Sequence, residues 1–374
     1  MTLLVNHVNN NHVEQEQDFV EEVNLGLNLS SLPAFIDDKN KYVYCISDNT
    51  IIVFNTRNGK RMHILKHHEK HLFVYANERY CISITQTGNL LRWDVETNTC
   101  AKVENFSKVP LSFVYKAKEG FYCVSSLSGS TQIAKLMLDA EGHFQSYSTF
   151  ANFSKVVKNR KHLAISDNFA VIITKPLHLE VISFKGKINF NQYICRSSFP
   201  NLEKPNHLAF DSVLLVEDTL YASLNIGRVM IFKAFTQTKF KTSNMAHFHR
   251  HPSAIEFVVT SRGVLYAGSG EATVTRWNLN ATGNARWQRP DNSEKFDAPV
   301  SCLSLSKDET LLVVQLEDNT VWIIQTSSMN ILCECQTMQW NVNFNWLPLC
   351  KDPMKPDLVI TGGRIGHIQW FDPV

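Results

Sequence analysis

Short apolar runs that each follow a turn recur along the whole chain, and most end in an aromatic residue. The markers of this repeat lie 39 to 48 residues apart, at Phe54, Trp93, Leu136, Phe184, Phe232, Trp277, Trp322 and Trp370. Two further apolar runs come before a marker. For example, "HLFVYA" and "YCISIT" come before Trp93. Polar turn residues separate these runs, and no helical period persists. Short strands at regular spacing, separated by turns, predict an all-β protein.

The length of the repeat indicates the architecture. Four short strands of one WD-type propeller blade take about 40–45 residues. One Trp-Asp pair is present, Trp93-Asp94, and Trp277-Asn278 is a near miss. The segment Lys66-His67-His68 takes the Gly-His position without the glycine. We predict an all-β WD-repeat β-propeller of seven blades with an extra terminal unit, held together by packing because Asp-His networks are mostly missing.

The repeat also predicts the domain organisation. Residues 1–28 are expected to be a partly flexible N-terminal segment, and residues 29–339 the propeller. Residues 340–374 are expected to be closing strands or the start of a second propeller. Three alternatives remain for this last unit: it closes the ring with the N-terminal "EEVNLGLNL" segment, begins a second propeller, or adds an eighth blade.

Composition narrows the class of protein. The net charge is +2, from 37 basic and 35 acidic side chains, so the total charge does not indicate nucleic-acid binding. The chain has nine cysteines, and four of them lie in apolar runs and are expected to be free, buried thiols: Cys45, Cys81, Cys123 and Cys302. No signal peptide and no apolar run near about 20 residues is present. These features predict a cytosolic or nuclear protein with no membrane partner.

Motifs for catalysis are missing from the sequence. We find no G-x-S-x-G, phosphate-binding loop or H-E-x-x-H pattern. "HFHRH" at 247–251 offers three histidines, but no partner stands at ligand spacing, so a linker is the better interpretation. "TGGRIG" at 361–366 precedes a strand and is interpreted as a hairpin turn. We therefore predict no enzyme, no cofactor, no metal and no small-molecule substrate.

Two basic clusters are the candidate RNA contacts. Exposed basic turns can pair with phosphates and add salt-dependent affinity. Either cluster taken alone is more commonly a solvated surface turn. The residues are Lys155, Lys158, Arg160 and Lys161 in "SKVVKNRKH", and Arg57, Lys60 and Arg61 in "TRNGKR".

The order of the blades resembles that of a known family. "KYVYCISDNTIIVFNTRNGKRMHILKHHEKHL" is similar to its first blade, and "GNLLRWDVETNTC" to its one well-formed Trp-Asp blade. "LYAGSGEATVTRWN" and "LLVVQLEDNTVWIIQ" resemble its sixth and seventh units, and "LVITGGRIGHIQWFDP" its Gly-rich hairpin. The family is the nucleolar WD-repeat subunit of the UtpA subcomplex of the small-subunit processome, numbered seventy-five in animals. The resemblance runs from about Lys41 to Val374.

This resemblance implies a non-enzymatic scaffold in early ribosome biogenesis. It implies a nucleolar protein that supports precursor ribosomal RNA transcription, small nucleolar RNA binding, processome assembly and rRNA processing. The implied partners are other UtpA-type subunits and precursor ribosomal RNA. Family members carry tandem propellers and a helical C-terminal region, so this chain corresponds to the first propeller.

A second functional class stays open. A WD-repeat adaptor would present a top-face protein-binding site in another complex, for example as the noncatalytic subunit of a transfer-RNA methyltransferase or of a ubiquitin ligase. Association with precursor ribosomal RNA and a nucleolar location would distinguish the processome subunit from such an adaptor.

Overall fold

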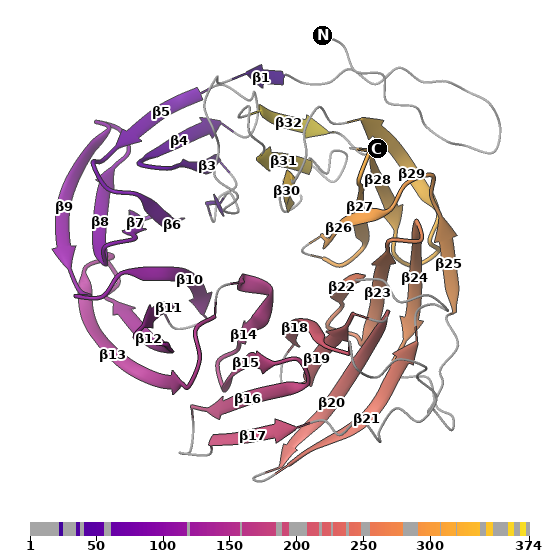
Figure 1. Ribbon diagram of the computed structural model, residues 1–374. Helices are drawn as coiled ribbons and strands as arrows, with labels where there is room; N and C mark the ends of the chain where they lie inside the picture. The colour runs from indigo at the N-terminus through magenta and orange to yellow at the C-terminus, as the bar shows by residue number, and fades with distance from the viewer. Residues whose placement is uncertain are drawn as a thin grey trace. The chain divides into compact units, whose positions relative to one another are not determined.

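The strands of the computed structural model form eight four-stranded sheets (Figure 1). The structure describes residues 22–24, 35–37, 41–55, 61–117, 120–157, 159–184, 189–193, 208–216, 219–225, 227–236, 239–247, 255–279, 291–306, 308–318, 320–336, 342–346, 358–362 and 367–371. Neighbouring strands pair antiparallel. Seven sheets each take four consecutive strands, and the eighth has the order β1-β32-β31-β30. This matches the predicted seven blades with an extra terminal unit.

The chain divides into two compact units by its internal contacts. The first unit comprises Met1–Val114, Leu136–Tyr147 and Ser304–Val374. Its strands are β1 (Glu22–Asn24), β2 (Phe35–Ile36), β3 (Tyr42–Ser47), β4 (Thr50–Asn55), β5 (Arg61–Lys66), β6 (His71–Ala76), β7 (Cys81–Thr85), β8 (Asn89–Asp94), β9 (Thr99–Asn105), β27 (Leu311–Leu316), β28 (Thr320–Gln325), β29 (Ile331–Gln336), β30 (Val342–Trp346), β31 (Leu358–Gly362) and β32 (His367–Phe371).

The second unit comprises Tyr115–Lys135 and Ser148–Leu303. Its strands are β11 (Gly120–Leu127), β14 (Leu163–Ile165), β15 (Phe169–Lys175), β16 (His178–Ser183), β17 (Asn189–Tyr193), β18 (Phe210–Val216), β19 (Thr219–Leu224), β20 (Arg228–Thr236), β21 (Lys239–His247), β22 (Ile255–Val259), β23 (Val264–Ser269), β24 (Thr273–Asn278) and β25 (Asn292–Lys295), with the 3-10 helix η1 (Arg160–His162). Strands β10 (Leu111–Ala117), β12 (Ser130–Leu138), β13 (Phe144–Phe153) and β26 (Val300–Leu305) contribute residues to both units.

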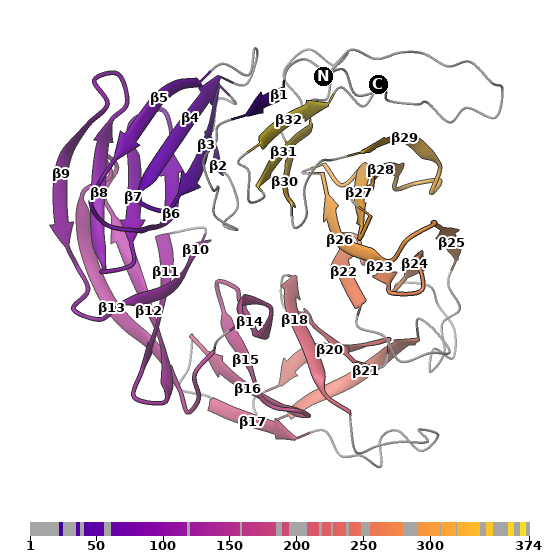
Figure 2. The same cartoon turned by 45° about the horizontal axis from the view of Figure 1, so that its top comes forward.

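Burial within a sheet follows the order of the strands. In the sheet β6–β9, all five residues of β7 are buried, whereas six of the seven residues of β9 are polar or small and most of them are exposed. Figure 2 gives a second view in which β9 can be followed along the outside of this sheet. The continuous apolar run of β7 is therefore explained by burial on both faces of the strand, as the sequence predicted.

Side chains on the two faces of one strand enter two different cores. In β20, Met230 and Phe232 belong to a cluster with the buried residues of β15 and β16. Val229 and Ile231 point the other way and pack with Leu265 and Trp277 of the next sheet. Because side chains alternate along a strand, one apolar strand joins both neighbouring sheets. This packing of strand against strand stabilises the sheets.

The terminal sheet joins the two ends of the chain. Strand β1 pairs antiparallel with β32, with Val23 opposite Ile368. This is the arrangement in which the N-terminal "EEVNLGLNL" segment completes the last unit. Three strands from the C-terminal part and one from the N-terminal part therefore form a four-stranded sheet, as in the other seven units.

Strand register corrects two markers of the repeat. Trp93 and Trp277 are the fifth residues of β8 and β24, and both are buried. In β28 the fifth residue is Ile324, whereas Trp322 lies two residues earlier. Phe184 follows the last residue of β16. The spacing between aromatic residues locates each sheet but does not fix the position of the aromatic residue in its strand. Several positions along one strand face the same side of the sheet.

The predicted free thiols are confirmed for the cysteines in apolar strands. Cys45, Cys81 and Cys123 are free and buried, and Cys302 is free but only partly buried. Burial raises the pKa of the Cys302 thiol to about 11. Cys45, Cys81 and Cys123 act as small apolar residues of the core.

Candidate functional site

The basic cluster at 154–162 lies between β13 and β14. Lys155 and Lys161 are exposed, Arg160 is half-buried, and Lys158 lies outside the described residues. The backbone here is fixed by Thr131, whose hydroxyl donates to the Lys155 carbonyl at 2.7 Å and accepts from the Val157 amide at 2.8 Å. The structure therefore places Lys155 on an ordered turn.

Two of these basic side chains already have partners within the second unit. The Arg160 guanidinium lies over the Tyr115 ring, 4.7 Å from its centroid. The Lys161 ammonium forms an ion pair with Glu256. By contrast, Lys155 has no ion-pair partner among the described residues. Among the described members of this cluster, Lys155 is thus the best placed to meet an external anion.

The second basic cluster is described in part. Arg57 and Lys60 lie outside the described residues. Arg61 begins β5 and is exposed, with no carboxylate partner in the part of the chain that the structure describes. It pairs in the backbone register with Phe54.

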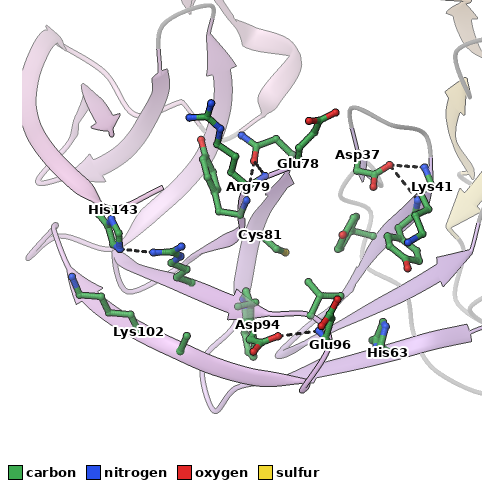
Figure 3. Close-up of a pocket in the computed structure, with 18 residues that line it drawn as sticks. Asp37, Lys41, His63, Glu78, Arg79, Cys81, Asp94, Glu96, Lys102 and His143 are labelled. Carbon is green, nitrogen blue, oxygen red and sulfur yellow. Dashed lines mark hydrogen bonds between the residues drawn. The ribbon is translucent and has the colours of Figure 1, made fainter. Parts of the chain in front are cut away.

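A polar groove in the first unit was not predicted from the sequence. Its volume is about 730 Å³, and turns at one end of the sheets β2–β5 and β6–β9 line it, together with the tip of the β12–β13 hairpin (Figure 3). The lining residues are Asp37, Lys41, Tyr42, Tyr44, His63, Asn77, Glu78, Arg79, Tyr80, Cys81, Arg92, Trp93, Asp94, Val95, Glu96, Ala101, Lys102 and His143. Several are exposed, so the groove is open to solvent.

The turns around the groove are held by their own polar side chains. Asp37 accepts hydrogen bonds from the Lys41 and Tyr42 amides, at 2.7 and 3.2 Å. Asn77 accepts from two amides of its turn, both at 2.9 Å. Asp94 accepts from the Glu96 amide at 3.0 Å. Aspartate and asparagine favour such turns because their short side chains reach the backbone two or three residues on.

Hydrogen bonds also favour the charged forms of Asp94 and Asp139. The amide of Thr97 donates to Asp94 and lowers the pKa of that carboxyl. Hydrogen bonds from His143, first from its amide, lower the pKa of Asp139. A hydrogen-bonded carboxylate favours its charged form. The negative charges at this end therefore belong to the turn structure and persist at neutral pH.

Arg92 differs from two other cations of the groove, Lys102 and Arg79. Lys102 pairs with Glu104 at 2.7 Å, and Arg79 lies 3.7 Å from Glu141. The half-buried Arg92 guanidinium instead bonds to the Nε2 atom of His143, and no carboxylate among the described residues pairs with it. Because arginine has only donors, Nε2 accepts this bond. The proton of His143 then lies on Nδ1, 3.2 Å from Asp139 Oδ2.

Buried residues make a rigid wall for the groove. The Trp93 indole donates to the Ser83 hydroxyl at 2.8 Å, and Trp93 is 4% exposed. Gly142 packs directly on the Tyr80 ring: a Cβ there would lie 2.5 Å from a ring atom, and the φ of Gly142 is +80°. Glycine at this position therefore lets the β12–β13 hairpin tip approach the β6–β7 turn.

A buried histidine that sequence reasoning missed lies behind this wall. His71 begins β6, is 0% exposed, and meets the edge of Trp93 with ring centroids 6.0 Å apart. Burial lowers the pKa of His71 to about 4. The Gly-His-like segment Lys66-His67-His68 predicts His67 or His68 at the histidine position, but His68 is exposed. His71 could have been found as the first residue of the apolar run "HLFVYA".

Neither metal ligation nor membrane insertion gains support from the described residues. No group of three or more His, Cys, Asp or Glu side chains in the described ranges could hold a metal ion. Most of "HFHRH" and the residues 363–366 of "TGGRIG" lie outside the described part of the chain. Within the described residues, no helix has the length and apolarity that a membrane span requires.

Comparison with known sequences supports the family resemblance. No protein-family model matches the chain. WD repeat-containing protein 75 of Xenopus laevis is 23% identical over 347 residues, which cover 88% of this chain and 40% of the relative. The protein of the same name from Danio rerio is 23% identical over 369 residues, covering 92% and 42%. The resemblance stated from the blades is confirmed, and the chain spans about two fifths of the length of these relatives.

Comparison with solved structures confirms the fold. Saccharomyces cerevisiae Sqt1 matches with a TM-score of 0.66 and 10% identity, over 94% of this chain and 97% of that one. The computationally designed Ika8 protein matches with a TM-score of 0.58 and 15% identity, over 93% and 98%. BamB from Moraxella catarrhalis matches at 0.57 and 12%, over 94% and 98%. The chain is a WD-repeat β-propeller, a fold typical of non-catalytic scaffolds.

Proposed function

We propose that this chain is a non-enzymatic scaffold of early ribosome biogenesis. It supports transcription of precursor ribosomal RNA, assembly of the small-subunit processome and rRNA processing, and it works in the nucleolus. Its partners are precursor ribosomal RNA and other UtpA-type subunits. The observation that carries this proposal is the similarity to two curated relatives of one name over about nine tenths of the chain, together with the propeller fold.

The RNA contacts of this scaffold are proposed at the two basic turns. Lys155 and Arg61 are exposed and have no ion-pair partner among the described residues, so each can reach a phosphate at low cost. Arg160 can turn one edge of its guanidinium outward while it stacks on Tyr115. The proposed set is completed by Lys158, Lys161, Arg57 and Lys60.

Crosslinking of the tagged chain to RNA in cells, followed by sequencing of the bound RNA, tests the function. Reads concentrated on the 5′ external spacer of precursor ribosomal RNA are expected. Lys155→Glu and Arg61→Glu should reduce those reads, while Lys175→Glu and Lys66→Glu, which reverse exposed lysines outside the clusters, should not. In vitro, the logarithm of the RNA association constant falls with the logarithm of the salt concentration. Each lost phosphate contact should make this slope less steep by about 0.7.

A library without enrichment of ribosomal precursor would contradict the proposal. The WD-repeat adaptor would then be the better account. Enrichment that neither cluster variant changes would retain the function but remove the basic turns as the RNA contacts.

The domain boundaries belong to the same proposal. Residues 29–339 are proposed as the propeller body, residues 340–374 as its closing strands and residues 1–28 as a partly flexible segment. The pairing of β1 with β32 supports a structural role for the end of that segment. Limited proteolysis is expected to cut before β1, and a first cut between residue 29 and β3 would contradict these boundaries.

A further inference from the structure

The groove in the first unit carries both signs of charge on its rim. Figure 3 shows Lys102 and His143 on one side and Asp37 and Lys41 on the other, with Asp94 and Glu96 between them. Six of the lining side chains that bear charge are also exposed, so a ligand would meet charges of both signs in an open channel. We propose that this groove binds an extended peptide segment of a partner protein, with an acidic residue on Arg92 and a basic residue near Glu96. This site goes beyond the scaffold function proposed above and does not depend on it.

Arg92 is the anchor of the proposed site. Its guanidinium is half-buried, and its one side-chain hydrogen bond among the described residues is with the acceptor Nε2 of His143. A guanidinium has five N–H donors, so the bond to His143 does not use up its capacity to bind a ligand. A carboxylate of the peptide would give Arg92 the charged partner that Lys102 and Arg79 already have in Glu104 and Glu141. Arginine binds a carboxylate through two parallel hydrogen bonds, which fixes direction as well as position.

His143 and Asp139 position this anchor. Asp139 holds the His143 ring through Nδ1 and also accepts the His143 amide, at 3.2 and 2.9 Å. The imidazole is therefore fixed in the tautomer that accepts from Arg92. A guanidinium held in this way loses less side-chain freedom when a ligand binds. We assign His143 as a positioning residue, since it acts on the peptide through Arg92.

A second feature of the groove suits a main chain. Strand β9 is the outermost strand of its sheet. Its register shifts at Ala101: Cys100 is opposite Trp93 and Lys102 is opposite Arg92, so Ala101 has no cross-strand partner. A bulge at a sheet edge leaves peptide groups unpaired and redirects neighbouring side chains. An added peptide strand can use such groups.

The charges of the groove favour a peptide over RNA. Asp37, Glu78, Asp94 and Glu96 line the groove and would repel a phosphate backbone. Glu96 makes no hydrogen bond or ion pair through its carboxylate among the described residues, so it is available to a lysine or arginine of the ligand. A peptide with acidic and basic residues a few positions apart complements both Arg92 and Glu96.

The test begins with the 374-residue chain and a library of random linear peptides displayed on phage. Selected peptides are expected to combine Asp or Glu with Lys or Arg. The most enriched peptide, labelled with fluorescein, is then titrated by anisotropy. Arg92→Gln should weaken binding about tenfold or more, because a charged hydrogen-bonded pair is lost. Glu96→Gln, at an exposed position, should weaken it about threefold. Arg262→Gln and Glu317→Gln, at exposed positions outside the groove, are matched controls and should leave affinity unchanged.

Two further measurements separate recognition from folding. Far-UV circular dichroism and thermal unfolding of each variant show whether the propeller is intact. His143→Ala should weaken binding in the wild-type background and have little effect in the Arg92→Gln background, because it acts through Arg92. A peptide whose acidic residue is replaced by Gln should bind wild type and Arg92→Gln with similar affinity.

Several results would overturn the proposal. One is a library that yields no enriched peptide; another is an enriched peptide that binds folded Arg92→Gln as tightly as wild type. Displacement of the peptide by an unstructured RNA oligonucleotide, with loss of RNA binding in Arg92→Gln, would assign the groove to RNA. These outcomes are independent of the RNA-crosslinking result at the basic turns, so the two proposals can fail separately.

Discussion

The second and sixth sheets of the propeller place a tryptophan at the same position and surround it differently. Trp93 of β8 and Trp277 of β24 are both fifth in their strands and are 4% and 2% exposed. Trp93 donates to Ser83, whereas the corresponding position of β23 is Ala267, which has no side-chain oxygen. The first residue of β6 is His71, paired with Thr85, and the first residue of β22 is Ile255, paired with Ser269.

This difference shows which parts of a blade are required and which are optional. Both sheets keep the buried tryptophan and the same turn between their second and third strands, with an amide bonded back to Thr85 in one and to Ser269 in the other. The second sheet adds a polar link and a buried imidazole. The sixth sheet holds the same geometry with apolar residues at these places. Packing therefore builds the blade, and polar groups adjust its stability and its response to pH.

Truncation of either tryptophan should have the largest effect. Trp277→Ala is expected to lower the free energy of unfolding by about 3–5 kcal/mol, because a large buried side chain is replaced by a cavity. Trp93→Ala should lower the free energy of unfolding by ~1 kcal/mol more than Trp277→Ala does, because it also leaves the Ser83 hydroxyl without its donor. Urea unfolding followed by far-UV circular dichroism measures both. Equal losses would remove the energetic difference between the two sheets.

The buried imidazole should make stability depend on pH. In the folded chain the pKa of His71 is lowered to about 4 by burial, with a further lowering by His67 and opposing effects of Glu69 and Asp48. The unfolded chain binds the proton near the ordinary value of about 6.5. Between these values the unfolded state holds more protons, so stability falls as pH drops from about 6.5 towards 4, by about 3 kcal/mol in total.

Urea unfolding between about pH 8 and about pH 5 measures this dependence. His71→Phe should abolish most of the fall in stability, whereas His68→Gln, which changes an exposed neighbour, should retain it. If the stability of His71→Phe falls with decreasing pH as steeply as that of wild type, groups other than His71 cause the pH dependence. The sixth sheet, with Ile255 at the corresponding place, has no such titration at this position.

The case of His71 shows how far the sequence could lead. The repeat of apolar runs predicted the sheets because burial on both faces demands continuous apolar strands. It could not assign His71, since register, rather than the Gly-His-like segment Lys66-His67-His68, decides which histidine is buried. Local composition also found the basic turns. It could not reveal that Lys161 meets Glu256, because that contact joins residues far apart in the chain.

The groove was beyond the reach of the sequence for the same reason. Its walls come from short turns of two sheets and from a hairpin tip that carries His143, and each turn alone looks like ordinary surface. The aspartates that cap these turns are common turn residues. What distinguishes the site is a half-buried Arg92 without a carboxylate partner among the described residues, and that is a property of the fold.

The Trp93–Ser83 bond should give a smaller, pairwise effect. Ser83→Ala is expected to cost about 1–2 kcal/mol, because the buried indole N–H loses its acceptor. In a double-mutant cycle with Trp93→Phe, the two changes should be less than additive by about 1 kcal/mol. The matched pair in the sixth sheet, Ala267→Gly with Trp277→Phe, should show much weaker coupling. Full additivity at Ser83 and Trp93 would mean that the bond does not contribute to stability.

The turns of the two sheets should give the smallest effect, and one of opposite sign. Gly88 and Ala272 hold the same place, with φ of +84° and +59°. At Gly88 a Cβ would lie 2.6 Å from Ser107, so Gly88→Ala should destabilise the chain by both contact and conformation. Ala272 already bears a Cβ in the left-handed region, at a cost of about 1–2 kcal/mol. Ala272→Gly removes that strain, which stabilises the folded chain. Part of this effect is lost, because glycine has more conformational freedom in the unfolded chain. The free energy of unfolding should therefore rise by about 0.5 kcal/mol. Thermal unfolding of the two variants side by side measures the difference. A loss of stability in Ala272→Gly would show that the alanine methyl contributes packing that outweighs the strain of its backbone.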